Sequence, residues 1–289
     1  MHLTYIINKK DVDKSINSIL TNNLDISSRL LNKLINNKKV LLNKKICDTR
    51  NIPHLNDILT IDFSTVEDNS NVVPSKMDLD IVYEDEWFLI INKPAGIPIH
   101  PSRSHFENSL SNGVRFYFDT IGLQKKTRPV NRLDLDTSGL VIFAKCEYIQ
   151  ECFIRQMSSN LFQKEYLCLV NGSLMSKTGT IDLPISRKSD SIIERCVDLK
   201  NGQPSITYYK VIKEFPSYSL VKCKLGTGRT HQIRVHMANI GHPLLGDTLY
   251  GTRSTFIDRQ ALHSYKIKCI HPISKKPLTF EASLPSDLL

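Results

Sequence analysis

The sequence lacks the long apolar stretches that membrane spans and export signals require. No apolar run in its 289 residues is longer than five residues, whereas a membrane-spanning helix needs about 20. The first ten residues also lack the apolar core of a signal peptide. An integral membrane protein is thereby excluded, and we expect no membrane partner.

The spacing of the cysteines excludes two classes of site. None of the seven is spaced as Cys-x-x-Cys, so zinc ribbons and thioredoxin-type redox motifs are absent. Their number is odd, and several lie within apolar stretches, as Cys168 does. This pattern is typical of reduced, buried thiols, and it predicts a cytoplasmic protein without a bound metal.

Acidic residues are outnumbered by basic ones. The chain has 38 lysines and arginines against 29 aspartates and glutamates, which gives a formal net charge of +9. Such a charge favours a polyanionic partner, with RNA or DNA ahead of a membrane surface. Composition alone leaves a generic basic protein equally open.

The positive charge is concentrated between residues 29 and 50, where Asp48 is the only acid. The basic residues there are Arg29, Lys33, Lys38, Lys39, Lys44, Lys45 and Arg50. Residues 67–86 are acidic instead and begin with several turn-forming residues. We therefore expect a solvated acidic linker over 66–80, between a domain at 1–65 and a larger one at 81–289.

The first domain is predicted to be a small basic α/β unit. Helical apolar spacing over 15–20 and 28–35 is followed by short strands at 39–42 and 58–63. Two helices before a basic β unit resemble an S4-like RNA-binding domain. The resemblance implies that Arg29 and the five lysines named above contact an RNA backbone rather than specify bases. A basic helical cap on the larger domain is the alternative.

Strands dominate the larger domain. They are predicted at 87–91, 140–144 and 164–170, with helices at 147–158 and 230–240. These elements predict an α+β fold built on a mostly antiparallel mixed sheet with flanking helices.

A polar cluster precedes the strand at 140–144. Within it, Asp134 lies two residues from both Arg132 and Asp136. Two interpretations remain open at this point. Asp134 is either an ordinary turn aspartate or a catalytic carboxylate at the mouth of a cleft, with an arginine beside it.

A second polar stretch, at 226–247, does not fit two common motifs. Its glycines lack the spacing of a phosphate-binding loop. His231 and His236 are five residues apart, so they do not share a helix face as paired zinc ligands would. We expect Thr230 to cap a helix in which Arg234 lies beside the apolar stripe. A partly buried arginine needs a carboxylate partner.

Together with Lys164–Tyr166, these stretches resemble the RluA family of pseudouridine synthases. Residues 131–139 match its motif His-Arg-Leu-Asp-x-x-Thr-Ser-Gly, except that Asn131 replaces the histidine. Residues 92–96 and 228–236 resemble two further motifs of the family. The resemblance covers most of the larger domain, and an S4-like domain before it is also a family arrangement.

The resemblance implies an enzyme that isomerises uridine in RNA to pseudouridine without a metal or a cofactor. It assigns three catalytic residues. Asp134 is the carboxylate, Arg234 is the arginine paired with it, and Tyr166 is a tyrosine that packs on the base and can assist removal of the proton from C5. It places Arg132 in the space left when the uridine flips out of the RNA. Asn131 removes a titratable group, and we expect activity to be retained.

The target RNA and two other functional classes remain open. Large-subunit rRNA is the first expectation and tRNA the alternative, and the protein is expected to act as a monomer. A non-catalytic RNA-binding ribosome-assembly factor would not need Asp134, Tyr166 and Arg234 intact. A hydrolase with a carboxylate pair would use Asp134 and Asp136.

Overall fold

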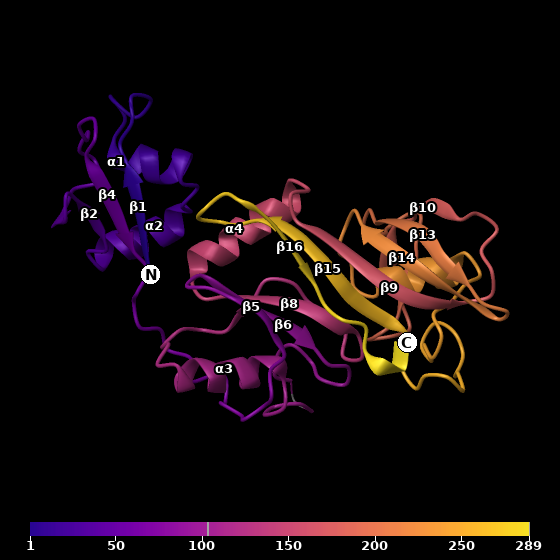
Figure 1. Ribbon diagram of the computed structural model, residues 1–289. Coiled ribbons are helices and arrows are strands. Elements are labelled where there is room, and N and C mark those ends of the chain that lie inside the picture. The colour runs from indigo at the N-terminus through magenta and orange to yellow at the C-terminus, as the bar shows by residue number, and fades with distance from the viewer. Residues whose placement is uncertain (103, 289) are drawn as a thin grey trace.

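The computed structural model describes residues 1–102 and 104–288. A small N-terminal unit lies beside one end of a long sheet (Figure 1). The unit has a four-stranded antiparallel sheet in the order β1-β4-β2-β3. Its elements are β1 (His2–Ile6), α1 (Ile16–Ser18), the π-helix η1 (Ile19–Asn23), α2 (Ser28–Asn36), β2 (Val40–Leu42), β3 (Lys45–Ile46) and β4 (Ile58–Asp62). Strand β1 was not predicted, because it is stabilised by pairing with β4, far along the chain.

The larger sheet has the strand order β10-β13-β14-β9-β15-β8-β6-β5, with β16 paired to β15 and β7 to β8. Among the described strand pairs only β15 and β8 run parallel. The predicted α+β fold with a mostly antiparallel mixed sheet is therefore confirmed. The strands are β5 (Ile81–Glu84), β6 (Phe88–Lys93), β7 (Arg128–Pro129), β8 (Ser138–Ala144), β9 (Gln163–Asn171), β10 (Thr178–Asp182), β13 (Ile206–Glu214), β14 (Tyr218–Leu225), β15 (Leu262–Ile270) and β16 (Pro277–Glu281).

Helices and a separate ribbon complete the larger domain. The helices are α3 (Leu110–Thr120), α4 (Glu147–Ser158), α5 (Gln232–Asn239) and a short 3₁₀ turn, η2 (Ser286–Leu288). Strands β11 (Ile185–Arg187) and β12 (Arg195–Val197) form a two-stranded antiparallel ribbon outside the main sheet. None of the helices in the described part of the chain has the length and apolar character to cross a membrane.

Strands β6 and β8 are buried at nearly every position because helices cover both faces of this part of the sheet (Figure 1). Successive side chains of a strand point to opposite faces. Leu89 and Val141 pack in the cluster that contains α3. Ile90 and Ile142 pack in the cluster that contains α4. The two buried strands therefore form a rigid support for the loops at their ends.

Helix α5 begins later than predicted. It starts at Gln232, and the preceding His231 has a left-handed conformation with φ of 57° and makes no side-chain cap. The predicted Thr230 cap is wrong because a tight turn closes there, with the Gln232 N–H bonded to the Arg229 carbonyl at 3.2 Å. Ile233 and Met237 face the core, as predicted.

The N-terminal unit shares one apolar cluster with the α4 face of the larger domain. Phe63 stacks on Tyr148 of α4, with ring centroids 5.1 Å apart, and meets Trp87 edge-on at 6.3 Å. The Tyr148 hydroxyl also donates to the Leu24 carbonyl at 2.9 Å. Since aromatic side chains dominate such interfaces energetically, the two domains are packed together rather than loosely tethered.

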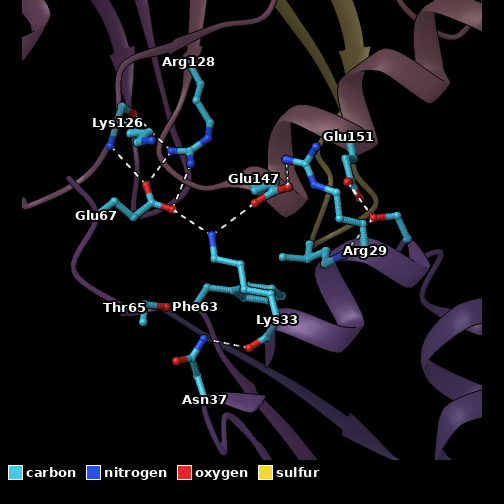
Figure 2. A network of polar contacts seen from close by, with 12 residues as sticks. Arg29, Lys33, Asn37, Phe63, Thr65, Glu67, Lys126, Arg128, Glu147 and Glu151 are labelled. Carbon is cyan, nitrogen blue, oxygen red and sulfur yellow. Dashed lines mark hydrogen bonds and ion pairs between the residues drawn. The ribbon is translucent and has the colours of Figure 1, made fainter. Parts of the chain in front are cut away.

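Charged side chains cross the same interface (Figure 2). Glu67 accepts two hydrogen bonds from Arg128, at 2.6 and 2.8 Å. Lys33 of α2 lies between Glu67 and Glu147, with Nζ–O distances of 3.8 and 3.3 Å. Arg29 also pairs with Glu147, at 3.0 Å. This network joins α2 and α4 to the segment that holds Glu67.

The expectation of a solvated linker over 66–80 is wrong at its first residues. The Glu67 side chain is only 10% exposed, and Asn69 and Val72 are buried. The Asn69 side-chain amide donates to the Lys125 carbonyl at 3.0 Å. Some acidic residues of this segment form ion pairs within the protein, as Glu67 does with Arg128. Local composition does not reveal such partners, because they lie far away in the sequence.

The basic residues expected to contact RNA fall into two groups. Three of them pair with carboxylates of the protein: Arg29, Lys33 and Lys39. Three others are exposed, and no ion pair joins them to a carboxylate in the described part of the chain: Lys38, Lys44 and Lys45. The second group is better placed to meet a phosphate, because no internal carboxylate competes for it.

We predict that Glu67→Gln lowers the free energy of unfolding by about 1–3 kcal/mol near neutral pH, because it leaves Arg128 half-buried without its anion. Burial opposes ionisation of Glu67, but the bonds from Arg128 outweigh it and hold the pKa of Glu67 below its usual value. The stabilisation is therefore complete above the usual carboxyl range and is lost as the pH falls through the folded-state pKa.

Urea unfolding of both proteins between about pH 6 and pH 3 measures this difference. The gap between wild type and Glu67→Gln should shrink as the pH falls. Asp48→Asn, which breaks the exposed pair with Arg50, is the matched control and should leave stability nearly unchanged. An equal effect of both substitutions would contradict a structural role for the interface network.

Candidate active site

Asp134 lies in the loop between β7 and β8 and borders two adjoining cavities. The first also contains Tyr166 and Arg234. The second has a volume of about 520 Å³ and extends past His100. We call the two together the Asp134 cavity. The Asp134 side chain is 26% exposed, so a ligand in the cavity can reach its carboxylate.

Arg234 joins Asp134 to a second carboxylate. Its Nη1 lies 3.2 Å from Asp134 Oδ2. Its Nε and Nη2 donate to the two oxygens of Asp247 at 2.7 and 2.8 Å. The sequence predicted a buried Arg234 with a carboxylate partner, and both are confirmed. Asp247 itself was not assigned as a partner, although it ends the second polar stretch.

The guanidinium of Arg234 is a permanent positive charge in a nearly closed site. Burial disfavours this charge, but the hydrogen bonds from Arg234 to Asp247 outweigh burial and raise its pKa above the usual value. The side chain of Asp247 is completely buried. Asp247 accepts two hydrogen bonds from Arg234 and balances most of its charge. Asp134, which faces the cavity, accepts only one longer hydrogen bond from the same guanidinium.

His231, which the sequence analysis excluded only as a zinc ligand, also borders the Asp134 cavity. Its Nε2 is 3.8 Å from Asp134 Oδ2, and its Nδ1 is 2.8 Å from the hydroxyl of Tyr250. Burial lowers the pKa of His231 in spite of the nearby Asp134. The imidazole is therefore neutral at physiological pH, and Arg234 supplies the positive charge of the site.

Tyr166 on β9 is 5% exposed and borders the same cavity. Burial raises the pKa of its hydroxyl, and the charge of Asp134 adds to this effect. The hydroxyl is thus protonated at any physiological pH. Its ring offers the cavity a flat apolar wall, as a nucleobase requires.

Arg132 has an exposed side chain that borders both parts of the Asp134 cavity. No ion pair joins it to a carboxylate within residues 1–102 and 104–288. It is therefore free to contact a ligand. The six basic residues proposed for the N-terminal unit do not border this cavity.

Two cations hold the backbone of the Asp134 loop. Lys93 is completely buried, and its Nζ donates to three carbonyls at 2.8 Å, including that of Leu135. Arg259 donates to the carbonyl of Asp136 at 2.9 Å. Burial lowers the pKa of Lys93 to about 7. Both side chains were missed by the sequence analysis, because carbonyl partners leave no signal in the sequence.

Asn131 supports the loop from its other side. Its side-chain amide donates to the Leu140 carbonyl and accepts from the Ile142 N–H, both at 3.0 Å. The Asn131 side chain therefore bonds to the backbone of β8 in the way that the peptide group of a neighbouring strand would. The Asn131 side chain is buried away from the cavity, which explains how this position can differ from the family motif.

Comparison with known proteins agrees with this geometry. Residues 87–239 match the family described as RNA pseudouridylate synthase. The chain is 36% identical over 288 residues to the RNA pseudouridine synthase YhcT of Bacillus subtilis, an alignment that covers 99% of this chain and 95% of that protein.

The chain belongs to the RNA pseudouridine synthases.

Two further likenesses support the assignment to the RluA family within these synthases. The chain is 34% identical over 279 residues to ribosomal large subunit pseudouridine synthase D of Escherichia coli, which covers 92% of this chain and 85% of that protein. Human RNA pseudouridylate synthase domain containing 1 has a similar structure, with a TM-score of 0.61 and 28% identity over 72% of this chain and 84% of that one. The protein is therefore an isomerase that acts on RNA.

We predict that Asn131→Leu lowers the free energy of unfolding by about 2–4 kcal/mol, because two buried backbone groups lose their partners. Asn131→His can make both bonds with one ring tautomer, so its rate of pseudouridine formation should stay within a few-fold of wild type. Urea unfolding and initial rates measure the two effects. Wild-type stability of Asn131→Leu, or a gain of orders of magnitude in Asn131→His, would contradict this role.

Proposed function

We propose that this synthase isomerises uridines of large-subunit rRNA and that Asp134 is its catalytic carboxylate. One observation carries the proposal. A partly exposed carboxylate, held by a buried arginine, faces a cavity whose wall includes a protonated tyrosine. Asp134 provides a negative charge for the sugar, and the Tyr166 ring provides a flat surface for the base within the same cavity.

The chemistry explains why these groups are needed. The N1–C1′ bond of uridine breaks, the uracil rotates, and C5 bonds to C1′. The C5 proton is then released, and N1 gains a proton. Asp134 would act at the sugar, either by adding to it or by removing a proton. Arg234 supplies the positive charge that a carboxylate requires once RNA displaces water from the cavity.

Tyr166 is proposed to pack against the target uracil. A tyrosine whose pKa is raised by burial is a poor base at neutral pH, since it must first ionise. Direct removal of the C5 proton by Tyr166 is therefore less favoured than contact with the base.

Arg132 is proposed to fill the space in the RNA that the flipped uridine leaves. The target base is unreachable while stacked, so it must leave the helix. Arg132 is exposed at the cavity wall, and within residues 1–102 and 104–288 it forms no ion pair with a carboxylate. A planar guanidinium stacks on neighbouring bases better than an ammonium group does.

The substrate and the role of the N-terminal unit rest on likeness. The related protein of Escherichia coli is named for the large ribosomal subunit, which favours rRNA over tRNA. We propose that residues 1–65 form an S4-like domain whose exposed lysines, Lys38, Lys44 and Lys45, contact RNA phosphates. A monomeric, cytoplasmic protein without a cofactor remains our expectation.

A carboxylate-pair hydrolase is less favoured. Asp134 borders both parts of the Asp134 cavity, and Asp136 borders neither. The Asp136 carbonyl is instead bound by Arg259. The two carboxylates therefore do not act on one ligand from opposite sides.

Release of tritium from bulk RNA labelled at C5 of uridine tests the proposal without knowledge of the site. Asp134→Asn should lower the rate by at least about 10³-fold, because it removes the reacting carboxylate. The matched control, Asp136→Asn, should stay within tenfold of wild type. Equal loss in both variants would show that the isomerisation needs both carboxylates and would contradict the assignment to Asp134 alone, and no release by the wild type would leave the hydrolase open. Full activity of Asp134→Asn would contradict the proposal. Separate labelled rRNA and tRNA fractions identify the substrate class.

A further inference from the structure

The arginines in the described part of the chain divide into two groups by their partners. One group pairs with carboxylates: Arg29, Arg50, Arg115, Arg128, Arg234 and Arg259. The other group has no carboxylate partner in residues 1–102 and 104–288: Arg132, Arg155, Arg187, Arg195, Arg229 and Arg253. Most of the second group lies at or beside the Asp134 cavity. Most arginines without a carboxylate partner are thus concentrated in one region of the larger domain.

Three of these unpaired arginines border a separate cavity of about 440 Å³, which we call the arginine trough. They are Arg187, Arg195 and Arg229, and no acidic residue borders the trough with them. Gly228, Arg229 and Thr230 border both the trough and the Asp134 cavity. The two cavities therefore adjoin each other along the turn that precedes α5.

The ribbon of β11 and β12 places two like charges side by side. Arg187 and Arg195 are directly opposite each other in its antiparallel register. Like charges at such positions destabilise a strand pair, and no carboxylate of the described protein relieves the repulsion. An anion bound between the two guanidinium groups would relieve it.

The ribbon is also fixed to the active site. The Arg195 N–H donates to the hydroxyl of Tyr250 at 2.8 Å, and this hydroxyl is 2.8 Å from His231 Nδ1. The Tyr250 ring lies against the guanidinium of Arg234, 5.1 Å from centroid to Cζ. The distance between the trough and Asp134 is therefore set by rigid contacts, as a binding site for a neighbouring nucleotide requires.

We propose that the arginine trough binds backbone phosphates of the RNA strand next to the uridine in the Asp134 cavity. The inference rests on the proposed function. Guanidinium groups recognise phosphate with two parallel hydrogen bonds. Such contacts position an RNA without reading its bases. The trough thus sets the register of the strand, and the Asp134 cavity receives the flipped nucleotide.

The double variant Arg187→Gln with Arg195→Gln tests the proposal, with bulk RNA tritiated at C5 of uridine as the probe. The apparent KM should rise by about 10- to 100-fold, and KM should account for most of the loss in kcat/KM. The slope of log KM against log salt concentration should become shallower by roughly 1.4, as expected for two lost contacts to single-stranded RNA.

The matched control is Arg155→Gln with Arg253→Gln, which removes the same charge from unpaired arginines outside the trough and the Asp134 cavity. It should keep the KM and the salt slope of wild type. Thermal unfolding checks the fold, and the trough variant should be at least as stable as wild type because it removes a repulsion.

Three outcomes would overturn the proposal. These are an unchanged KM in the trough variant, an equal rise in KM in the control, and a fall in the saturating rate alone. Each of these outcomes can be read only if the wild-type protein releases tritium in the same assay. If the wild type itself released none, the proposed function would fail first, and the two failures are thereby distinguished.

Discussion

The candidate active site depends on one buried ion pair, in which Asp247 holds Arg234. Removing one partner of such a pair leaves an uncompensated charge in a closed site, which is costly. Asp247 also accepts hydrogen bonds from the N–H groups of Leu249 and Tyr250, at 3.1 and 3.3 Å. The same carboxylate thus orients the arginine that meets Asp134 and folds the segment that carries Tyr250. Through Tyr250, it also fixes His231 and the β11–β12 ribbon.

Asp134 is positioned from its own side by backbone contacts. Lys93 and Arg259 bind carbonyls of its loop, and Asn131 attaches the loop to β8. These side chains use their donors within the protein and do not face the ligand. A small shift of a reacting group costs a large factor in rate, so the proposed role of Asp134 requires this support of the loop. The two-sided burial of β6 and β8 makes the supporting sheet rigid.

Sequence reasoning found the elements whose signals are local. The bounds of α4, the face of α5 and the need of Arg234 for a carboxylate followed from spacing and charge. The proposed role of Asp134 came from resemblance to a family, since the residues around it alone favoured an ordinary turn aspartate. Strand β1, the partner Asp247 and the three carbonyls around Lys93 depend on contacts between distant residues. The acidic segment was misread for the same reason, because Arg128 lies far from Glu67 in the sequence.

The most direct test of the central claim is the single-turnover rate of tritium release by Arg234→Lys. Lysine keeps the positive charge that Asp247 needs, so the protein should fold. It lacks the planar fork that reaches two carboxylates at once. We predict a rate at least about 100-fold below wild type, with thermal unfolding close to that of wild type. A folded Arg234→Lys variant with a rate within a few-fold of wild type would contradict the claim that this bridge organises the site.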